Sequence, residues 1–260
     1  MTKNFWFDGG DAVVHAFLRD CDSLRRSVNL STMGNTVIDC CGDKKLDVVD
    51  VGGGHGRQAV WFARNGHNVV IVEPDARMIE SAQQAISREP SSVSRRITLI
   101  EAKGEDAFKS VQRKFDAVLC HSVISYLEEP SSLFENLADL CKTDGIVSIV
   151  TPNPQSAAMR CALNRRWEDA IAAISTCSDR SPHYVMDKEW PVEVLISNLA
   201  RHRLSVSERR GVGIFIDGLD SELTEDEFKF ACEAEILGSI TDPYRLIARC
   251  YQLICRASDE

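Results

Sequence analysis

Residues 47–56 read Asp-Val-Val-Asp-Val-Gly-Gly-Gly-His-Gly, and this stretch decides the fold. It begins as a short β-branched apolar run, which is typical of a strand buried on both faces of a sheet. Glycines follow because a strand-to-helix reversal needs backbone angles open to residues without Cβ, and because a ligand then approaches the main chain closely. The helix expected near Arg57 directs free N–H groups and a positive dipole end at that ligand. The pattern favours an anionic or carboxylate-bearing ligand, although a flexible turn between two elements has a similar composition.

Strand and helix patterns alternate outward from this loop over about a hundred residues. Four further apolar runs predict buried strands, and amphipathic segments between them predict helices. The alternation indicates an α/β fold with a doubly wound parallel sheet and right-handed crossovers. The expected strands are 47–52, 68–73, 97–101, 115–120 and 146–151, and the expected helices are 56–66, 75–88 and 131–142.

Helical patterns dominate the flanks of this core. Residues 8–42 read as two helices, one over 11–24 and one over 29–41, ended by Gly42-Asp43. Thr224 and Glu227 have the spacing of a capping box, which predicts the start of a late helix between two candidate strands. The expected later helices are 155–176, 191–204 and 224–237, and the expected later strands are 205–216 and 245–256.

We therefore expect four segments. They are an N-terminal helical cap (1–45), a ligand-binding core (46–151), a helical lid insertion (152–190), and a C-terminal helix with antiparallel strands that complete the sheet (191–260).

Composition excludes several classes of protein. Apolar residues make up 44% and charged residues 27%, so the chain can bury a core and is not mainly disordered. Lys+Arg 30 against Asp+Glu 39 gives a net charge of -9, which offers nucleic acid no domain-wide cationic field. The 10 cysteines form no C-x-x-C pair, so no metal site is expected. No apolar run approaches the ~18 residues of a membrane span, which predicts a cytoplasmic protein with reduced thiols and no membrane partner. The sequence leaves the oligomeric state open between monomer and homodimer.

Polar side chains at the ends of the next three strands strengthen the ligand-site interpretation. Glu73 ends the second strand, 19 residues after Gly54, where a carboxylate accepts hydrogen bonds from both ribose hydroxyls of a nucleoside cofactor. Glu105 and Asp106 follow the third strand and can bring a carboxylate to an adenine amino group. His121 follows the fourth, at the crevice where open α/β sheets bind ligands.

Two classes of cofactor fit a glycine-rich turn followed by an acidic side chain that binds a ribose. Gly54-x-Gly56-x-x-Ala59 also satisfies the dinucleotide pattern, so an NAD-dependent oxidoreductase stays an alternative. Asp50 argues against it, because a carboxylate just before the glycines orients the loop towards a cationic amino-acid group. The acidic side chain expected near the adenine also argues against an oxidoreductase. So does the pair of antiparallel strands expected near the end of the chain. A cofactor-binding partner subunit without transferase activity is the remaining alternative.

Residues 46–151 resemble a class I S-adenosylmethionine-dependent methyltransferase. The resemblance implies a Rossmann-like doubly wound mixed sheet of strand order 3-2-1-4-5-7-6, with strand 7 antiparallel. It also implies S-adenosylmethionine as cofactor and S-adenosylhomocysteine as product. The matching stretches are D-V-G-G-G-H-G (50–56), V-E-P-D-A-R-M-I (72–79), G-E-D-A (104–107) and F-D-A-V-L-C-H-S-V-I-S-Y-L (115–127).

The resemblance also implies which residues contact the cofactor. Asp50 and the glycines surround the methionine end, Glu73 the ribose and Asp106 the adenine. Met78 either packs beside the base or belongs to the core. The full expected set is Asp50, Gly52, Gly53, Gly54, Gly56, Glu73, Pro74, Met78, Glu105, Asp106 and His121.

Within that family the layout is similar to bacterial enzymes that methylate the carboxylate of 5-carboxymethoxyuridine in tRNA. The similar stretches are 120–130, 152–159, 211–219 and 242–249. Gly213, Ile216 and Gly218 stand where larger polar side chains are expected to hold a modified uridine, and the first 45 residues lack a basic stretch. Because Lys and Arg contacts to phosphate supply much of RNA affinity, a small-molecule acceptor is favoured and tRNA remains the alternative.

Methyl transfer from a sulfonium to an O or N atom is an in-line displacement, to which an enzyme contributes mainly alignment. An alcohol, phenol or ammonium acceptor must lose a proton, and His121 is the leading base or orienting residue. Its alternative role is a hydrogen bond to the backbone or the cofactor loop. His183 and Tyr184 are reserve catalytic candidates in the variable segment before Pro191. A carboxylate acceptor needs only a cationic clamp, with Arg160, Arg165, Arg166 and Arg249 as candidates.

Overall fold

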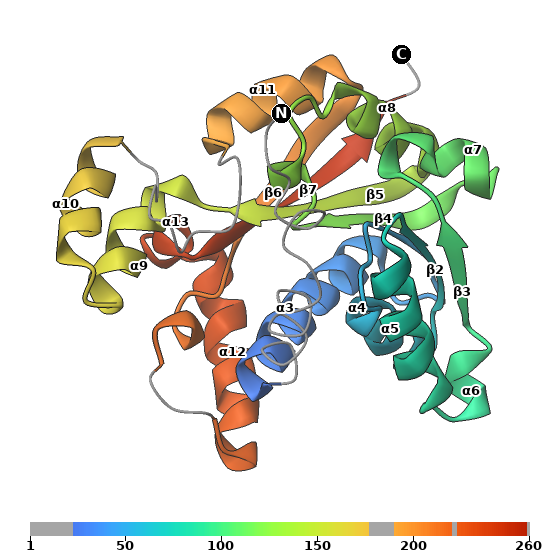
Figure 1. The fold of residues 1–260 in the computed structure, drawn as a ribbon, viewed down its shortest axis with the longest axis horizontal. Coiled ribbons are helices and arrows are strands. Elements are labelled where there is room, and N and C mark those ends of the chain that lie inside the picture. Colours follow the sequence, from blue (N-terminus) through green and yellow to red (C-terminus); the bar gives the residue numbers. More distant parts are fainter. Residues whose placement is uncertain (1–22, 177–189, 220–222, 259–260) are drawn as a thin grey trace.

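The computed structural model describes residues 23–176, 190–219 and 223–258 (Figure 1). Its strands form one seven-stranded sheet of order β3-β2-β1-β4-β5-β7-β6. Strands β1 to β5 pair in parallel, whereas β7 is antiparallel to both β5 and β6. This confirms the expected mixed sheet. The strands are β1 Asp47–Val51, β2 Asn68–Glu73, β3 Ile97–Glu101, β4 Phe115–His121, β5 Cys141–Pro152, β6 Leu204–Val212 and β7 Cys250–Ala257.

Helices cover both faces of the sheet (Figure 1). Helices α3, α4, α5 and α12 lie on one face, and α7, α8 and α11 lie on the other. Helices α9 and α10 project beyond the end of β5. Among the described residues, no helix is long and apolar enough to cross a bilayer. The helices are α3 Leu24–Cys41, α4 Arg57–Arg64, α5 Ala76–Ser87, α6 Ser91–Ser94, α7 Ala107–Val111, α8 Ser131–Leu140, α9 Ala157–Leu163, α10 Trp167–Thr176, α11 Val192–Arg201, α12 Glu225–Ile240 and α13 Tyr244–Ile247.

The side chains of β1 alternate between the two faces of the sheet, and this alternation places a carboxylate against one of the helical layers. Val49 and Val51 belong to the core under α7, α8 and α11, whereas Val48 belongs to the core under α3 and α4. Because side chains alternate along a strand, Asp50 faces the α3 and α4 side. The apolar run therefore buries a charged group as well as three valines.

The strands bring polar loops to one edge of the sheet, which we call the carboxyl edge because the parallel strands β1 to β5 all end there. Antiparallel β7 begins at this edge, with Cys250 paired to Pro152 at the end of β5. β6 ends there, with Val212 paired to Cys250. The loops after β1 to β6 therefore meet at this edge, beside the start of β7.

Helix α3 corrects the expected boundary between two N-terminal helices. It runs unbroken from Leu24, and the Ser23 side chain caps it by accepting a hydrogen bond from the backbone N–H of Arg26. Leu24, expected in an earlier helix, therefore opens this one. The remainder of the earlier expected helix lies outside the described residues.

The stretch 155–176 is two helices, where the sequence predicted one. Helix α9 ends at Leu163, and the Asn164 side chain donates to the Arg160 carbonyl, 2.8 Å away. Arg165 then takes a left-handed conformation with φ 57°. This reverses the chain, and α10 packs back against α9.

The two late strands are shorter than predicted. β6 ends at Val212 because Gly213 turns the chain with φ 68°. β7 begins only at Cys250, because residues 244–247 form α13. The expected capping box is present at Thr224 and Glu227, and α12 packs against α3 and β6.

Candidate active site

The glycine loop, residues 52–56, wraps over the end of β1. Gly52 donates its N–H to the Val72 carbonyl, 2.7 Å away, and has φ +73°. A Cβ there would lie 2.5 Å from Cγ2 of Val123, so the loop and the turn after β4 are in contact. Gly54 has φ +54° with no atom within 4 Å of its would-be Cβ, which leaves an open approach to the main chain.

Glu73 fastens this loop to the end of β2. Its carboxylate accepts hydrogen bonds from the N–H groups of Gly54 and Asp75, each at 2.9 Å. The side chain is buried, and burial raises the pKa of Glu73 while the two backbone hydrogen bonds lower it.

Asp50 lies beneath the loop. The residue is 3% exposed, and its Oδ2 would meet a Cβ on Gly53 at 2.9 Å. Burial raises the pKa of Asp50 to about 7, and the nearby charge of Glu73 adds to the effect. None of the hydrogen bonds among the described residues ends on this carboxylate. A cation or hydrogen-bond donor beside it would favour its charged form.

The expected adenine side lies beyond β3. Glu105 is half-buried and Asp106 is exposed, both in the short 3-10 helix Gly104–Asp106. Met78 is buried in α5 and Pro74 is exposed between β2 and α5. Burial of Met78 is compatible with both of its expected roles.

His121 ends β4 and heads a line of polar groups that crosses three strands. Its Nε2 lies 2.9 Å from Oγ of Ser148, which accepts a hydrogen bond from Nε2 of Gln252 at 2.9 Å. Gln252 also donates to the Met33 carbonyl of α3, 3.2 Å away. The Nδ1 of His121 is buried without a hydrogen-bond partner. Its hydrogen-bonding capacity is therefore not used by any described residue.

Burial lowers the pKa of His121 to about 3. The imidazole is neutral at pH 7, but a group with so low a pKa accepts a proton poorly. The low pKa therefore argues against a strong general base at His121.

The turn after β4 contains two features that the sequence did not single out. Ser122 adopts φ 60°, uncommon for a residue other than glycine, and donates its N–H to the Val150 carbonyl. Val123 follows and packs on Gly52. The strained turn thus places an apolar side chain against the glycine loop.

The first turns of α3 lie across the same edge. The Ser27 hydroxyl accepts a hydrogen bond from the Arg57 guanidinium, at the start of α4, over 3.0 Å. Asn29, half a turn on, lies beside Gly213 at the end of β6. Helix α3 therefore spans from the glycine loop to the far side of the carboxyl edge.

Comparison with known proteins assigns this arrangement to a family. Residues 49–149 match the family model described as a methyltransferase domain. The chain contains a class I methyltransferase domain. Methyltransferases of this class take the methyl group from S-adenosylmethionine, which is the cofactor predicted from the sequence.

Two kinds of curated relative match the methyltransferase over most of its length. A tRNA 5-carboxymethoxyuridine methyltransferase of Escherichia coli (strain K12) is 26% identical over 218 residues, covering 83% of this chain and 81% of that protein. A ubiquinone biosynthesis O-methyltransferase of Rhodopseudomonas palustris (strain BisA53) is 26% identical over 207 residues, covering 76% and 70%.

Solved structures share the fold of the methyltransferase. The plantazolicin methyltransferase BamL, in complex with a substrate analogue and S-adenosylhomocysteine, superposes with a TM-score of 0.61 at 15% identity, covering 98% of this chain and 94% of that one. The magnesium protoporphyrin IX methyltransferase of Synechocystis PCC 6803 gives 0.57 at 16% identity, covering 90% and 86%.

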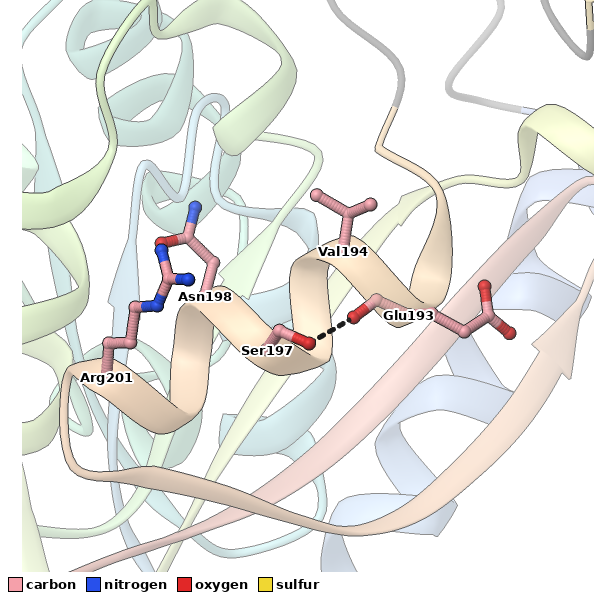
Figure 2. Close-up of a pocket in the computed structure, with 5 residues that line it drawn as sticks. All are labelled: Glu193, Val194, Ser197, Asn198 and Arg201. Atoms are coloured by element: carbon pink, nitrogen blue, oxygen red, sulfur yellow. Dashed lines mark hydrogen bonds between the residues drawn. The ribbon is translucent and has the colours of Figure 1, made fainter.

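The two reserve catalytic candidates, His183 and Tyr184, lie outside the described residues. A hollow of about 320 Å³ lies elsewhere, on the outer surface of α11 (Figure 2). All of its described lining residues come from this one helix, and the Ser197 hydroxyl donates to the Glu193 carbonyl there. No strand end contributes to the hollow, so the carboxyl edge remains the candidate site.

We predict that His121 makes the methyltransferase less stable in acid. The unfolded chain binds a proton at this residue below pH 6.5, whereas the folded chain binds it only near pH 3. The free energy of unfolding therefore falls as pH drops from 6.5 towards 3, by up to about 1.4 kcal/mol per pH unit. Urea unfolding of the wild type and His121→Gln between pH 7 and 4 measures the difference. Parallel stability curves would contradict a buried neutral imidazole.

Proposed function

We propose that this methyltransferase transfers the methyl group of S-adenosylmethionine to an O or N atom of a small-molecule acceptor by in-line displacement. The observation that carries the proposal is the order of groups along the carboxyl edge. Glu73 and Asp50 lie on the β2 and β1 side with the glycine loop, and His121 lies on the β4 side. One end of the edge thus suits a cationic nucleoside cofactor, and the other suits an uncharged contact to an acceptor.

On the cofactor side, we assign Asp50 and the glycine loop to the methionine end. The buried carboxyl lacks a hydrogen bond among the described residues, so a cationic group there would stabilise its charged form. Glu73 is assigned to the ribose, because its carboxylate already faces the Gly54 N–H at the open side of the loop. Glu105 and Asp106 are assigned to the adenine.

On the acceptor side, we assign His121 the role of orienting the acceptor. In an in-line displacement the acceptor atom bonds to the methyl carbon as the carbon–sulfur bond breaks, so alignment is the protein's main contribution. Ser148, which accepts a hydrogen bond from Gln252, holds Nε2 of His121, and we assign the buried Nδ1 to the acceptor. No covalent bond to the enzyme is required.

A tRNA carboxylate is the second candidate acceptor. The likeness to the Escherichia coli tRNA enzyme, at 26% identity over 83% of this chain, favours it. The net charge of -9 disfavours it, because Lys and Arg contacts to phosphate supply much of the affinity of a protein for RNA. The likeness to the ubiquinone biosynthesis O-methyltransferase supports a small molecule instead.

Methyl transfer assays decide between these acceptors. We expect S-adenosylhomocysteine to bind in calorimetry, and labelled methyl groups from S-adenosylmethionine to appear in the metabolite fraction of an extract. His121→Ala should slow transfer by about 10²-fold, the scale of a misplaced reactant, with S-adenosylhomocysteine affinity unchanged. His202→Ala on the far end of α11 serves as the control.

Each other result has a defined meaning. Label in the tRNA fraction would replace the small molecule with the second candidate. Failure to bind S-adenosylhomocysteine, or a requirement for a nicotinamide cofactor, would overturn methyl transfer. Full activity of His121→Ala would remove this residue from the mechanism.

A further inference from the structure

The side chains of His121, Ser148 and Gln252 form a line of hydrogen bonds under α3, which we call the polar line. We propose that Gln252, acting through Ser148, holds His121 as the tautomer with its proton on Nδ1, so that the ring donates a hydrogen bond to an oxygen of the methyl acceptor. Gln252 is then a positioning residue, since it acts on the acceptor only through His121. The contact to the acceptor rests on the function proposed above, whereas the tautomer is a property of the protein without ligands.

All three side chains of the polar line lie on the face of the sheet that α3 covers. Val150 pairs with His121 on one side and with Gln252 on the other, and Ser148 precedes it by two residues. Paired residues and residues two apart on a strand share a face, and Gln252 reaches the Met33 carbonyl of α3. Ser148 and Gln252 are each 0% exposed, so bulk water does not compete for their hydrogen bonds.

The Met33 carbonyl fixes the direction of the polar line. Because a carbonyl oxygen can only accept, the Gln252 atom that faces it at 3.2 Å must be the amide nitrogen. The same nitrogen lies 2.9 Å from Oγ of Ser148 and donates its second hydrogen there. The amide of Gln252 is therefore held in one orientation, and Ser148 has to accept from it.

Ser148 passes this direction on to His121. A hydroxyl has one hydrogen to donate, and this one has no partner other than Gln252 and His121 among the residues that the structure describes. Its hydrogen is therefore directed at Nε2 of His121, 2.9 Å away, which must be the nitrogen without a proton. In a neutral imidazole the proton is then on Nδ1.

The opposite tautomer leaves more buried groups unsatisfied. With the proton on Nε2, the Ser148 oxygen would accept from both neighbours, and its own hydrogen would have no acceptor within the described part of the chain. The lone pair of Nδ1 would be unpaired as well. With the proton on Nδ1, that N–H is the single unsatisfied group of the ring and the hydroxyl together. The Oε1 of Gln252 lacks a described partner in both cases, so it does not change the comparison.

A proton on Nδ1 determines which atom can face His121. An oxygen of a carboxylate, carbonyl or hydroxyl group accepts from this N–H, whereas an ammonium group has no lone pair to offer. The lone pair of the ring is on Nε2 and is bound by Ser148. His121 therefore orients the acceptor without taking its proton, and we expect the acceptor to present an oxygen to it.

Nitrogen-15 NMR of the histidine rings tests the tautomer in the full chain without ligand. Two-bond proton–nitrogen spectra at pH 7 report which nitrogen of a neutral imidazole carries the proton, and the spectrum of His121→Gln identifies the signal of His121. We expect the proton on Nδ1 in the wild type. Ser148→Ala removes the hydroxyl that donates to Nε2, so the share of the Nδ1–H form should fall.

Gln252→Glu should reverse the polar line. A carboxyl oxygen in place of the amide nitrogen can accept the Ser148 hydrogen. If the carboxyl is protonated, its own hydrogen is directed at the Met33 carbonyl, which can only accept, so Ser148 still finds an acceptor. The Ser148 oxygen then accepts from His121, and we expect the proton to move to Nε2.

Methyl transfer gives the second measurement. In Ser148→Ala and Gln252→Glu, Nδ1 presents a lone pair to the acceptor oxygen, and the rate of labelled methyl transfer into the metabolite fraction should fall about tenfold. S-adenosylhomocysteine affinity in calorimetry should stay within twofold of the wild type. Thr151→Val is the matched control, because it removes another fully buried hydroxyl of β5, one that lies 3.2 Å from the Ser125 hydroxyl. We expect it to keep the proton on Nδ1 and the wild-type rate.

Three results would overturn the inference. The first is a proton on Nε2 in the wild type, and the second is a proton that stays on Nδ1 in Ser148→Ala or Gln252→Glu. The third is a wild-type transfer rate in a variant whose tautomer has changed. If Gln252→Glu fails to fold by circular dichroism, the wild type and Ser148→Ala decide. The tautomer is measured without cofactor, and S-adenosylhomocysteine binding is measured separately, so a failure of the methyltransferase proposal is distinguishable from a failure of the tautomer inference.

Discussion

Gly52→Ala is expected to weaken S-adenosylhomocysteine binding by about 100-fold and to lower the free energy of unfolding by about 2 kcal/mol. A residue with Cβ is strained at φ +73°, and the new methyl group would lie 2.5 Å from Cγ2 of Val123. Either Val123 or the glycine loop must move. Since the loop carries the proposed cofactor contacts, its movement costs affinity as well as stability. Calorimetry and urea unfolding measure the two effects.

Gly66→Ala is the matched control for this substitution. Gly66 has φ +93°, but nothing lies within 4 Å of its would-be Cβ, so alanine there adds backbone strain without a collision. We expect it to lose about 1 kcal/mol of stability and no cofactor affinity. Val123→Ala should restore part of the affinity lost by Gly52→Ala. Wild-type affinity in Gly52→Ala alone would contradict the described packing.

Glu73→Gln is expected to weaken S-adenosylhomocysteine binding by 10- to 100-fold. One carboxylate oxygen becomes an amide NH₂, which faces the N–H of Gly54 or Asp75 donor to donor. The proposed hydrogen bonds to the ribose lose their charged acceptor, and hydrogen bonds to charged groups contribute about 1.5–3 kcal/mol each. Calorimetry at pH 8, above the raised pKa of Asp50, gives the affinity.

Glu101→Gln provides the comparison for Glu73→Gln. Glu101 pairs with Glu73 in the sheet register at the end of β3, but its side chain is exposed. Removing its charge should leave S-adenosylhomocysteine affinity within twofold of the wild type. Equal affinities for Glu73→Gln and the wild type would withdraw the ribose assignment.

The central strands could be predicted because each is a short β-branched run buried on both faces, and only such runs separate the helical segments. The predicted boundaries of several helices and strands were wrong where the tertiary structure overrode the local preference of the sequence. Arg165 turns the chain left-handed with neither Gly nor Pro to mark the break. Tyr244, Leu246 and Ile247 have side chains compatible with a strand, yet they fold with Arg245 as α13.

Candidate site residues could be predicted where they belong to a motif or directly follow a predicted strand, as Glu73 and His121 do. Asp50 belongs to the glycine-loop motif, so the motif located it. Val123 and Gln252 reach the site from other strands, and a single sequence gives no pairing between them. Ser148 could have been identified from the sequence, because its hydroxyl lies inside the apolar run 146–151 and a buried polar group needs a hydrogen-bond partner.

The position of β7 in the sheet sets an order on assembly during synthesis. β6 precedes β7 in the chain, but its only strand neighbour in the described sheet is β7, which lies between it and β5. Until residues 250–257 leave the ribosome, β5 has an open edge and β6 has nothing to pair with, a state prone to intermolecular pairing. The glycine loop can form earlier, since β1, β2 and β4 are made first. A nascent chain can therefore pair the strands of the proposed nucleoside-binding half before β6 and β7 complete the other half of the sheet.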